Sequence, residues 1–231
     1  MMSKAAVHAG GSVKENAAYE EVRNRIVPIL INYEGNKDYL TDKPFRKMQD
    51  LAVVYQLFEE NGESIRLKPV TREMFRAYDV RLDTLHDNAV QVMRTVMPSG
   101  MRFLEELVIE GKADKKMKMQ TVEAFLEKQE STGSPVCGAI VVSNSILCHG
   151  AGAILDPEVT AALAKVAGRD YLIIPSSIHE LIVIPRQMAE SLGSMRPMVR
   201  RVNRSMADES EILSDHIYTY DYVQQQLKIR Q

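Results

Sequence analysis

Tryptophan is absent from this chain, aromatic residues make up only 6% of it, and cysteine occurs twice. A core without tryptophan needs another filler, and the 13 methionines supply one because an unbranched side chain adapts to irregular gaps. We place Cys137 and Cys148 out of register on two neighbouring strands, so we expect no disulfide between them. Free, buried thiols of this kind suit a reducing compartment.

The chain also lacks an excess of charge of one sign. It has 29 basic and 31 acidic residues, which gives a formal net charge of −2. That balance supplies no long-range attraction to nucleic acid or to an anionic membrane, so we expect neither partner. No apolar run approaches the roughly 20 residues of a membrane span, and the first 13 residues lack the apolar stretch of a signal peptide. We therefore expect a cytoplasmic protein.

Common catalytic and cofactor signatures are missing as well. We find no Gly-x-Ser-x-Gly elbow, no Cys-x-x-Cys pair and no His-Glu-x-x-His pair. The Gly-rich stretch 150–153 is not followed directly by a helix carrying Lys-Ser or Lys-Thr, as a phosphate-binding loop would be. His149, His179 and His216 are separated by 30 and 37 residues. We therefore expect no cofactor and no metal site.

What remains is an ordinary globular composition, with 45% hydrophobic and 26% charged residues. The hydrophobic periodicity predicts an α+β fold, in which a helical N-terminal half with a small β-hairpin precedes a mixed or antiparallel sheet covered by helices. For the first half we expect a helix over 19–33 kinked at Pro28, strands over 51–58 and 65–68 around Asn61-Gly62, helices over 71–78 and 82–96, and two more within 101–130.

The second half of the chain differs in composition, because its first segments are apolar and rich in alanine and glycine. We expect strands over 136–142 and 146–155, a helix from Asp156-Pro157 to Gly168, a central hairpin of 171–175 and 178–184, a helix across 186–204 and a strand over 216–220. We divide the chain into a flexible tail (1–13), a mainly helical part with a hairpin (14–130) and a sheet-rich part (131–231). This boundary is soft, and a single domain is the alternative.

Several segments carry a resemblance to a known family. They are 50–55 (DLAVVY), 143–151, 174–180 (IPSSIHE), 202–204 (VNR) and 213–221 (LSDHIYTYD). On these residues the chain resembles the bacterial domain-of-unknown-function family DUF5688, an uncharacterised family of gut Gram-positive anaerobes. The resemblance covers most of residues 18–222 and implies a bacterial source. It implies no activity, because the family has none assigned.

Polar residues of the same segments form the candidate catalytic site. They are His179, Glu180, Ser176, Ser177, Asp215 and His216. In this hypothesis His179 or His216 is a general base, Asp215 or Glu180 orients it, and a serine is the nucleophile. The alternative is that the serines hold turns together and that Asp215 caps a helix or pairs with an arginine. No spacing in the sequence demands the catalytic interpretation.

The candidate binding residues are Asn203, Arg204, Arg196 and Arg200. The three arginines are four positions apart, so one helix face could present them to a phosphate group. A second basic group contains Lys112, Lys115, Lys116 and Lys118. The alternative is a solvated helix face whose arginines pair with the acidic residues at 208–211.

These observations favour a non-enzymatic cytoplasmic accessory or interaction protein with a protein partner that the sequence does not identify. One alternative is a hydrolase with a site around His179 and Asp215. Another is nucleic-acid or phosphate binding through the face of Arg196, Arg200 and Arg204. The sequence predicts no oligomeric state.

Overall fold

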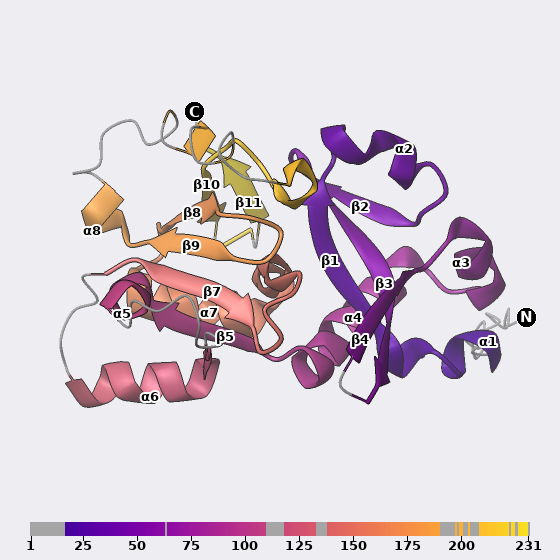
Figure 1. Ribbon diagram of the computed structural model, residues 1–231, viewed down its shortest axis with the longest axis horizontal. Helices are drawn as coiled ribbons and strands as arrows, with labels where there is room; N and C mark the ends of the chain where they lie inside the picture. The colour runs from indigo at the N-terminus through magenta and orange to yellow at the C-terminus, as the bar shows by residue number, and fades with distance from the viewer. Residues whose placement is uncertain are drawn as a thin grey trace, which may run out of the picture.

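The computed structural model describes residues 17–62, 64–109, 118–132, 138–189, 197, 199–200, 203, 208–221, 223–224 and 226–230. Its fold is α+β, as predicted, and the sheets are antiparallel. Figure 1 shows two sheets side by side, with β1–β4 at the right and a larger sheet at the left. Within the described residues the smaller sheet has four strands and the larger one has seven.

The smaller sheet is built around one long central strand. Its strands are β1 (Ile26–Asn32), β2 (Phe45–Met48), β3 (Leu51–Asn61) and β4 (Ser64–Pro69). β3 pairs with each of the other three. The hairpin predicted around Asn61-Gly62 is confirmed, and Gly62 has a φ of 64°, which glycine adopts without strain.

The helix predicted over 19–33 is wrong. Residues Ala17–Glu20 form the short helix α1, Arg23–Arg25 form the 3₁₀ turn η1, and the chain then enters β1. Six consecutive apolar residues, most of them β-branched, favour a strand buried on both faces over a one-sided helix. Pro28 fits because β1 lies at an edge of the sheet, where a missing N–H leaves no ladder bond unmade.

Helices of different lengths lie beside the smaller sheet. They are η2 (Glu34–Asn36), α2 (Lys37–Leu40), α3 (Arg72–Tyr78) and α4 (Leu82–Val96). The predicted cap of α3 is confirmed, since the Thr71 hydroxyl accepts a hydrogen bond from the Met74 N–H. α4 packs along β1 and buries Leu85, Ala89 and Met93, so methionine does fill part of this core.

The larger sheet follows the order β11-β10-β8-β9-β7-β5-β6. Its strands are β5 (Ser99–Phe103), β6 (Gln120–Thr121), β7 (Ile140–Asn144), β8 (Leu172–Pro175), β9 (Leu181–Ile184), β10 (Tyr218–Asp221) and β11 (Gln226–Ile229). The hairpin of β8 and β9 lies in the middle, as predicted from its apolar faces. β11 was missed because its sequence looked too polar for a strand.

The helices beside the larger sheet are α5 (Leu104–Ile109), α6 (Val122–Thr132) and α7 (Pro157–Ala167). The predicted start of α7 is confirmed, since the Asp156 carboxylate accepts from the Glu158 N–H and Pro157 occupies the first turn. Because β5 and β6 belong to this sheet, it takes strands from both sides of residue 131. The boundary that we placed there stays a prediction.

The strand predicted over 146–155 is also wrong, because residues Gly150–Leu155 form the 3₁₀ helix η3. η3 packs tightly between β7 and β1. A Cβ atom on Gly150 would clash with the Ser143 Oγ and with the His179 carbonyl oxygen. Cys148 is a free thiol, but it does not lie on a strand as the register argument assumed, and Cys137 lies outside the described residues. The expected absence of a disulfide between them stays a prediction.

Of the helix predicted across 186–204, the structure gives α8 (Arg186–Ala189), and most of the remainder lies outside the described residues. The 3₁₀ turn η4 (Glu209–Glu211) follows. Among the described residues we find no helix both long and apolar enough to cross a membrane.

Candidate functional site

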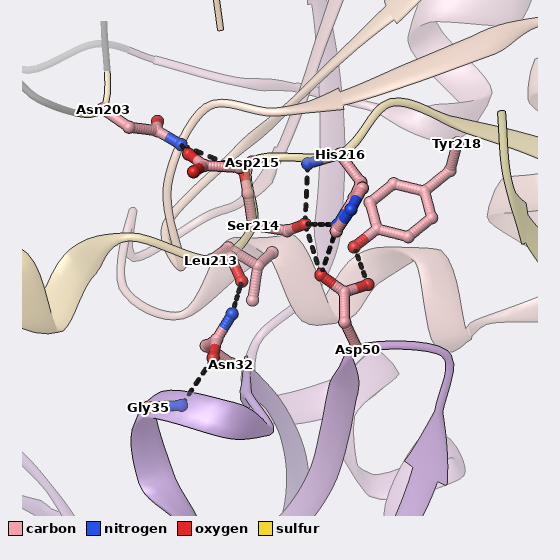
Figure 2. Close-up of polar contacts among 9 residues, drawn as sticks. All are labelled: Asn32, Gly35, Asp50, Asn203, Leu213, Ser214, Asp215, His216 and Tyr218. Atoms are coloured by element: carbon pink, nitrogen blue, oxygen red, sulfur yellow. Dashed lines mark hydrogen bonds and ion pairs between the residues drawn. The ribbon is translucent and has the colours of Figure 1, made fainter. Parts of the chain in front are cut away.

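Asp50 lies at the centre of a polar network that joins the two sheets (Figure 2). It follows Gln49 in the two-residue turn between β2 and β3, and Gln49 there has a φ of 59°. From the other sheet, Ser214 Oγ donates to Asp50 Oδ2 at 2.6 Å and Tyr218 OH donates to Oδ1 at 2.6 Å. His216 Nδ1 lies 3.0 Å from Oδ2. The carboxylate of Asp50 therefore accepts hydrogen bonds from three side chains, which belong to β10 and to the segment just before it.

These contacts fix the proton positions in the network. A carboxylate only accepts hydrogen bonds, so the Nδ1 of His216 carries a proton and its Nε2 is left as the second functional atom. Burial opposes ionisation of Asp50, but the hydrogen bonds from Ser214, Tyr218 and His216 outweigh it, and the pKa of Asp50 lies below its usual value. Burial, together with the bond to Asp50, raises the pKa of Tyr218.

The segment 213–215 is held from both sides. Asn32 at the end of β1 donates from Nδ2 to the Leu213 carbonyl at 3.0 Å, while its Oδ1 accepts from the Gly35 N–H (Figure 2). Asn203 donates from Nδ2 to the Ser214 carbonyl at 3.0 Å and to Asp215 Oδ1 at 2.7 Å. The Asp50 network is therefore rigidly supported.

Part of this network was predicted from the sequence, with His179 or His216 as the base and Asp215 or Glu180 as its orienting acid. The carboxylate beside His216 is Asp50, and Asp215 contacts Asn203 instead. Asp50 and Tyr218 were not proposed, although both stand in segments singled out for the family resemblance. Ser214 is fully buried and donates its proton to Asp50, so it is not arranged as a nucleophile.

His179 lies in a second polar cluster. The His149 backbone N–H donates to His179 Nδ1 at 3.2 Å, so the proton of a neutral His179 is on Nε2, which faces Glu211 Oε1 at 3.4 Å. The His149 and His179 rings are in contact, with centroids 5.7 Å apart. Burial, and then His179, lower the pKa of His149. The partner of His179 is thus Glu211, where the sequence hypothesis placed Asp215.

The remaining candidates of that segment bond within their own turn. Ser176 Oγ donates to Glu180 Oε1 at 3.1 Å, and Ser177 Oγ accepts from the His179 N–H at 3.0 Å. The Ile178 N–H donates to the Glu211 carbonyl at 2.9 Å, so the segments 176–180 and 208–211 do meet. These hydrogen bonds stabilise the turn between β8 and β9. The assignment of a hydrolase site to these residues stays a prediction.

A cleft of about 590 Å³ opens between the two sheets. Its lining comes from β2, β3 and α4 on one side and from η3, α7, β10 and β11 on the other. The lining residues are Arg46, Lys47, Met48, Gln49, Val53, His86, Asp87, Ile154, Leu155, Pro157, Tyr220, Gln224, Gln226 and Leu227. Gln49 bridges the two sides at one point, since its Nε2 donates to the Leu227 carbonyl at 3.0 Å.

The cleft is next to the Asp50 network. Gln49 precedes Asp50, and Tyr220 follows Tyr218 by two positions, which places both tyrosines on one face of β10. In the opposite wall, Tyr55 OH lies 3.2 Å from His86 Nδ1. Burial raises the pKa of Tyr55 and lowers that of His86. No local pattern of residues predicts this cleft, because its lining residues are scattered over the chain.

The basic residues proposed from the sequence lie elsewhere or are not described. Arg200 and Lys118 are exposed. The other members of these groups, Arg196, Arg204, Lys112, Lys115 and Lys116, lie outside the described residues. Within the described part of the chain, no group of three or more His, Cys, Asp or Glu side chains could hold a metal ion.

Comparison with known proteins gives one match. A family model described as a family of unknown function, DUF5688, matches residues 2–222. No curated protein and no solved structure matches the chain. Since the model covers nearly the whole sequence, the chain belongs to the family DUF5688.

Proposed function

We propose that the protein is a non-enzymatic accessory protein that binds a small polar molecule in the cleft between its two sheets. The observation that carries this proposal is the cleft itself, whose volume of about 590 Å³ lies within the usual range of ligand sites. Ligand sites favour junctions between structural units, because side chains from two directions can converge on one molecule there.

The lining supports binding in two ways. The buried residues Val53, Ile154 and Leu227 form an apolar floor. A ligand that covers this floor removes apolar surface from water, which favours binding. Charged and amide side chains stand around that floor and can fix the orientation of a ligand. A few polar groups over an apolar base are the usual composition of a specific small-molecule site.

The absence of tryptophan makes this proposal easy to test. Met48→Trp places the single tryptophan of the chain in the cleft, and Ile65→Trp places it on β4, where Ile65 is exposed and does not line the cleft. Each variant is titrated with a library of small polar metabolites. We expect at least one compound to change the emission of the first variant and leave the second unchanged. Compounds that affect both equally, or none that affects the first, contradict the proposal.

Acid–base chemistry at His216 is a second candidate, favoured by one specific observation. Asp50 orients the imidazole through Nδ1, and within the described residues no partner occupies its Nε2. About a third of the His216 side chain is exposed. A histidine held by a carboxylate in this way is the usual arrangement of a general base, and it would act on water rather than through Ser214.

A panel of ester, amide and phosphate substrates tests this candidate. If the protein hydrolyses any of them, His216→Gln should lower the rate by about 100-fold or more. His179→Gln is the matched variant, because His179 is also a histidine that is about a third exposed and lies beside an acid. If only the His179→Gln variant loses activity, the general base is His179 and not His216. A panel without hydrolysis contradicts the candidate.

A further inference from the structure

A second hollow, of about 440 Å³, lies between α3 and the start of β2 and is called here the α3 hollow. The Arg72 N–H donates to the Asp42 carbonyl oxygen at 2.6 Å, which fixes the start of α3 against the segment that leads into β2. The residues that line the α3 hollow are Lys43, Pro44, Phe45, Arg72, Phe75, Arg76 and Leu82. Of these residues none lines the cleft between the two sheets, so the α3 hollow is separate from that cleft.

Two arginines give the α3 hollow its charge. Arg72 and Arg76 are exposed and lie four positions apart on α3, so their Cβ atoms are roughly 5–6 Å apart and both guanidinium groups can reach one anion. Within the described residues neither side chain has an ion pair or a hydrogen bond of its own. The nearby carboxylate of Asp42 is bound by Lys43, whose Nζ lies 2.5 Å from Asp42 Oδ1. Lys43 therefore adds no free charge, and the two arginines are the cations that can receive an anionic group.

The rest of the lining is apolar. Pro44 is buried, and Phe45, Phe75 and Leu82 are half-buried. Phe75 stands on the helix face that carries the two arginines, because it is three positions after the first of them. In the described part of the chain, no carboxylate is among the lining residues. A ligand that fits the α3 hollow must therefore join an anionic group to an apolar body.

We propose that the α3 hollow binds a small aromatic phosphate monoester. Such a phosphate carries about −1.5 to −2 charges at neutral pH and three acceptor oxygens, so it can bind both guanidinium groups. A carboxylate carries one charge and would leave one arginine unpaired, while inorganic phosphate would leave the apolar lining in contact with water. The aromatic ring covers Phe45 and Phe75, with which it can make offset or edge contacts. A volume of about 440 Å³ lies within the usual range of small-molecule sites.

Phenyl phosphate is the probe, and calorimetry on the full chain measures its affinity beside the affinities of inorganic phosphate and phenol. We expect phenyl phosphate to bind about tenfold more tightly than either, because each of the other two lacks one half of the contacts. Arg72→Gln and Arg76→Gln should each weaken the binding of phenyl phosphate by about tenfold, since each removes charge-assisted hydrogen bonds. Phe75→Leu should weaken phenyl phosphate by about threefold and leave inorganic phosphate unchanged, because it removes a contact between rings.

Arg66→Gln is the matched control, because Arg66 is an exposed arginine on β4 that does not line the α3 hollow. Its affinity for phenyl phosphate should equal that of the wild type. Variants of Arg72 and Arg76 that bind as the wild type does, or inorganic phosphate that binds as tightly as phenyl phosphate, overturn the inference. A phosphotyrosine peptide that binds about tenfold more tightly than phenyl phosphate also overturns it, because the ligand would then be a protein segment. None of these results bears on the cleft between the sheets, which other residues line.

Discussion

The carboxylate of Asp50 accepts three hydrogen bonds from the other sheet, so replacing it tests the junction at the scale of one residue. Asp50→Ala leaves two buried hydroxyls, those of Ser214 and Tyr218, without their acceptor, at a cost of about 2–4 kcal/mol. Asp50→Asn keeps one acceptor oxygen and should cost roughly 1–2 kcal/mol. Urea unfolding followed by circular dichroism measures both. Asp38→Asn, on the exposed side of α2, should change stability by less than about 0.5 kcal/mol.

The same residue gives a pH dependence whose sign follows from its lowered pKa. A carboxyl group with a folded-state pKa below its unfolded value stabilises the fold above the unfolded pKa, here about 3.9. That stability is lost as the pH falls through the folded-state pKa. The free energy of unfolding should therefore fall more steeply below about pH 4 in the wild type than in Asp50→Asn. Parallel profiles for the two proteins would rule out a lowered pKa at Asp50.

Single residues of the site were predictable only where the local sequence singled them out. His216 and Asp215 stood in one polar segment and Asn203 in another, and all three were named as candidates. Their partners were not predictable, because Asp50 is 166 positions from His216 and meets it only through the packing of one sheet against another. The pairing of an acid with a base is a property of the tertiary fold, and the spacing in one sequence does not contain it.

Among the elements, α4 and α7 are joined by a side-chain pair that also caps a helix. Arg94 binds Asp156 with two hydrogen bonds, at 2.9 Å and 2.6 Å, while Asp156 caps α7 through the Glu158 N–H. Asp156→Ala removes the cap and the acceptor of a half-buried guanidinium group, so it should cost about 2–4 kcal/mol.

A double-mutant cycle separates the two roles of Asp156. Asp156→Asn keeps the capping oxygen and loses the charge, and in combination with Arg94→Met it should show a coupling energy of about 1–3 kcal/mol. Thermal or urea unfolding of the four proteins in the cycle provides the values. If the effects of the two substitutions on stability are additive, the prediction is wrong, because two side chains joined by two hydrogen bonds should not contribute independently.

Elements were predictable from the sequence where the signal was local. The cap of α7, the turn at Gly62 and the amphipathic face of α4 each depend on neighbouring residues, and all three were predicted. Two of the failures, β1 and η3, have a different origin. Apolar residues in β1 coincided with helical spacing, and η3 is shaped by the close approach of Ser143 and His179 to Gly150. Such packing is invisible in a hydrophobicity pattern.

In the whole molecule, the two sheets share one hydrophobic core. Leu51, Val53 and Tyr55 of the smaller sheet pack in the same cluster as Ile140 and other strand residues of the larger one. η3 lies between the sheets, and a Cβ on Gly152 would lie 3.3 Å from the Pro28 carbonyl oxygen of β1. Because of the shared core and the Asp50 network, we expect the two sheets to unfold as one cooperative unit despite the boundary that composition places near residue 131.

Gly150→Ala tests this cooperativity from a single site in η3. The added methyl group would clash with the His179 carbonyl oxygen and the Ser143 hydroxyl, and relieving the clash should cost about 3 kcal/mol or more. If the molecule unfolds as a unit, native-state hydrogen exchange will show the same loss of protection at Val53 in β3 and Ile173 in β8, because both amides then exchange through global unfolding. Gly35→Ala is the matched control, since its Cβ would make only ordinary contact. Wild-type protection at Val53 beside lost protection at Ile173 would mean that the two sheets unfold separately, and that the cleft between them joins two independent bodies.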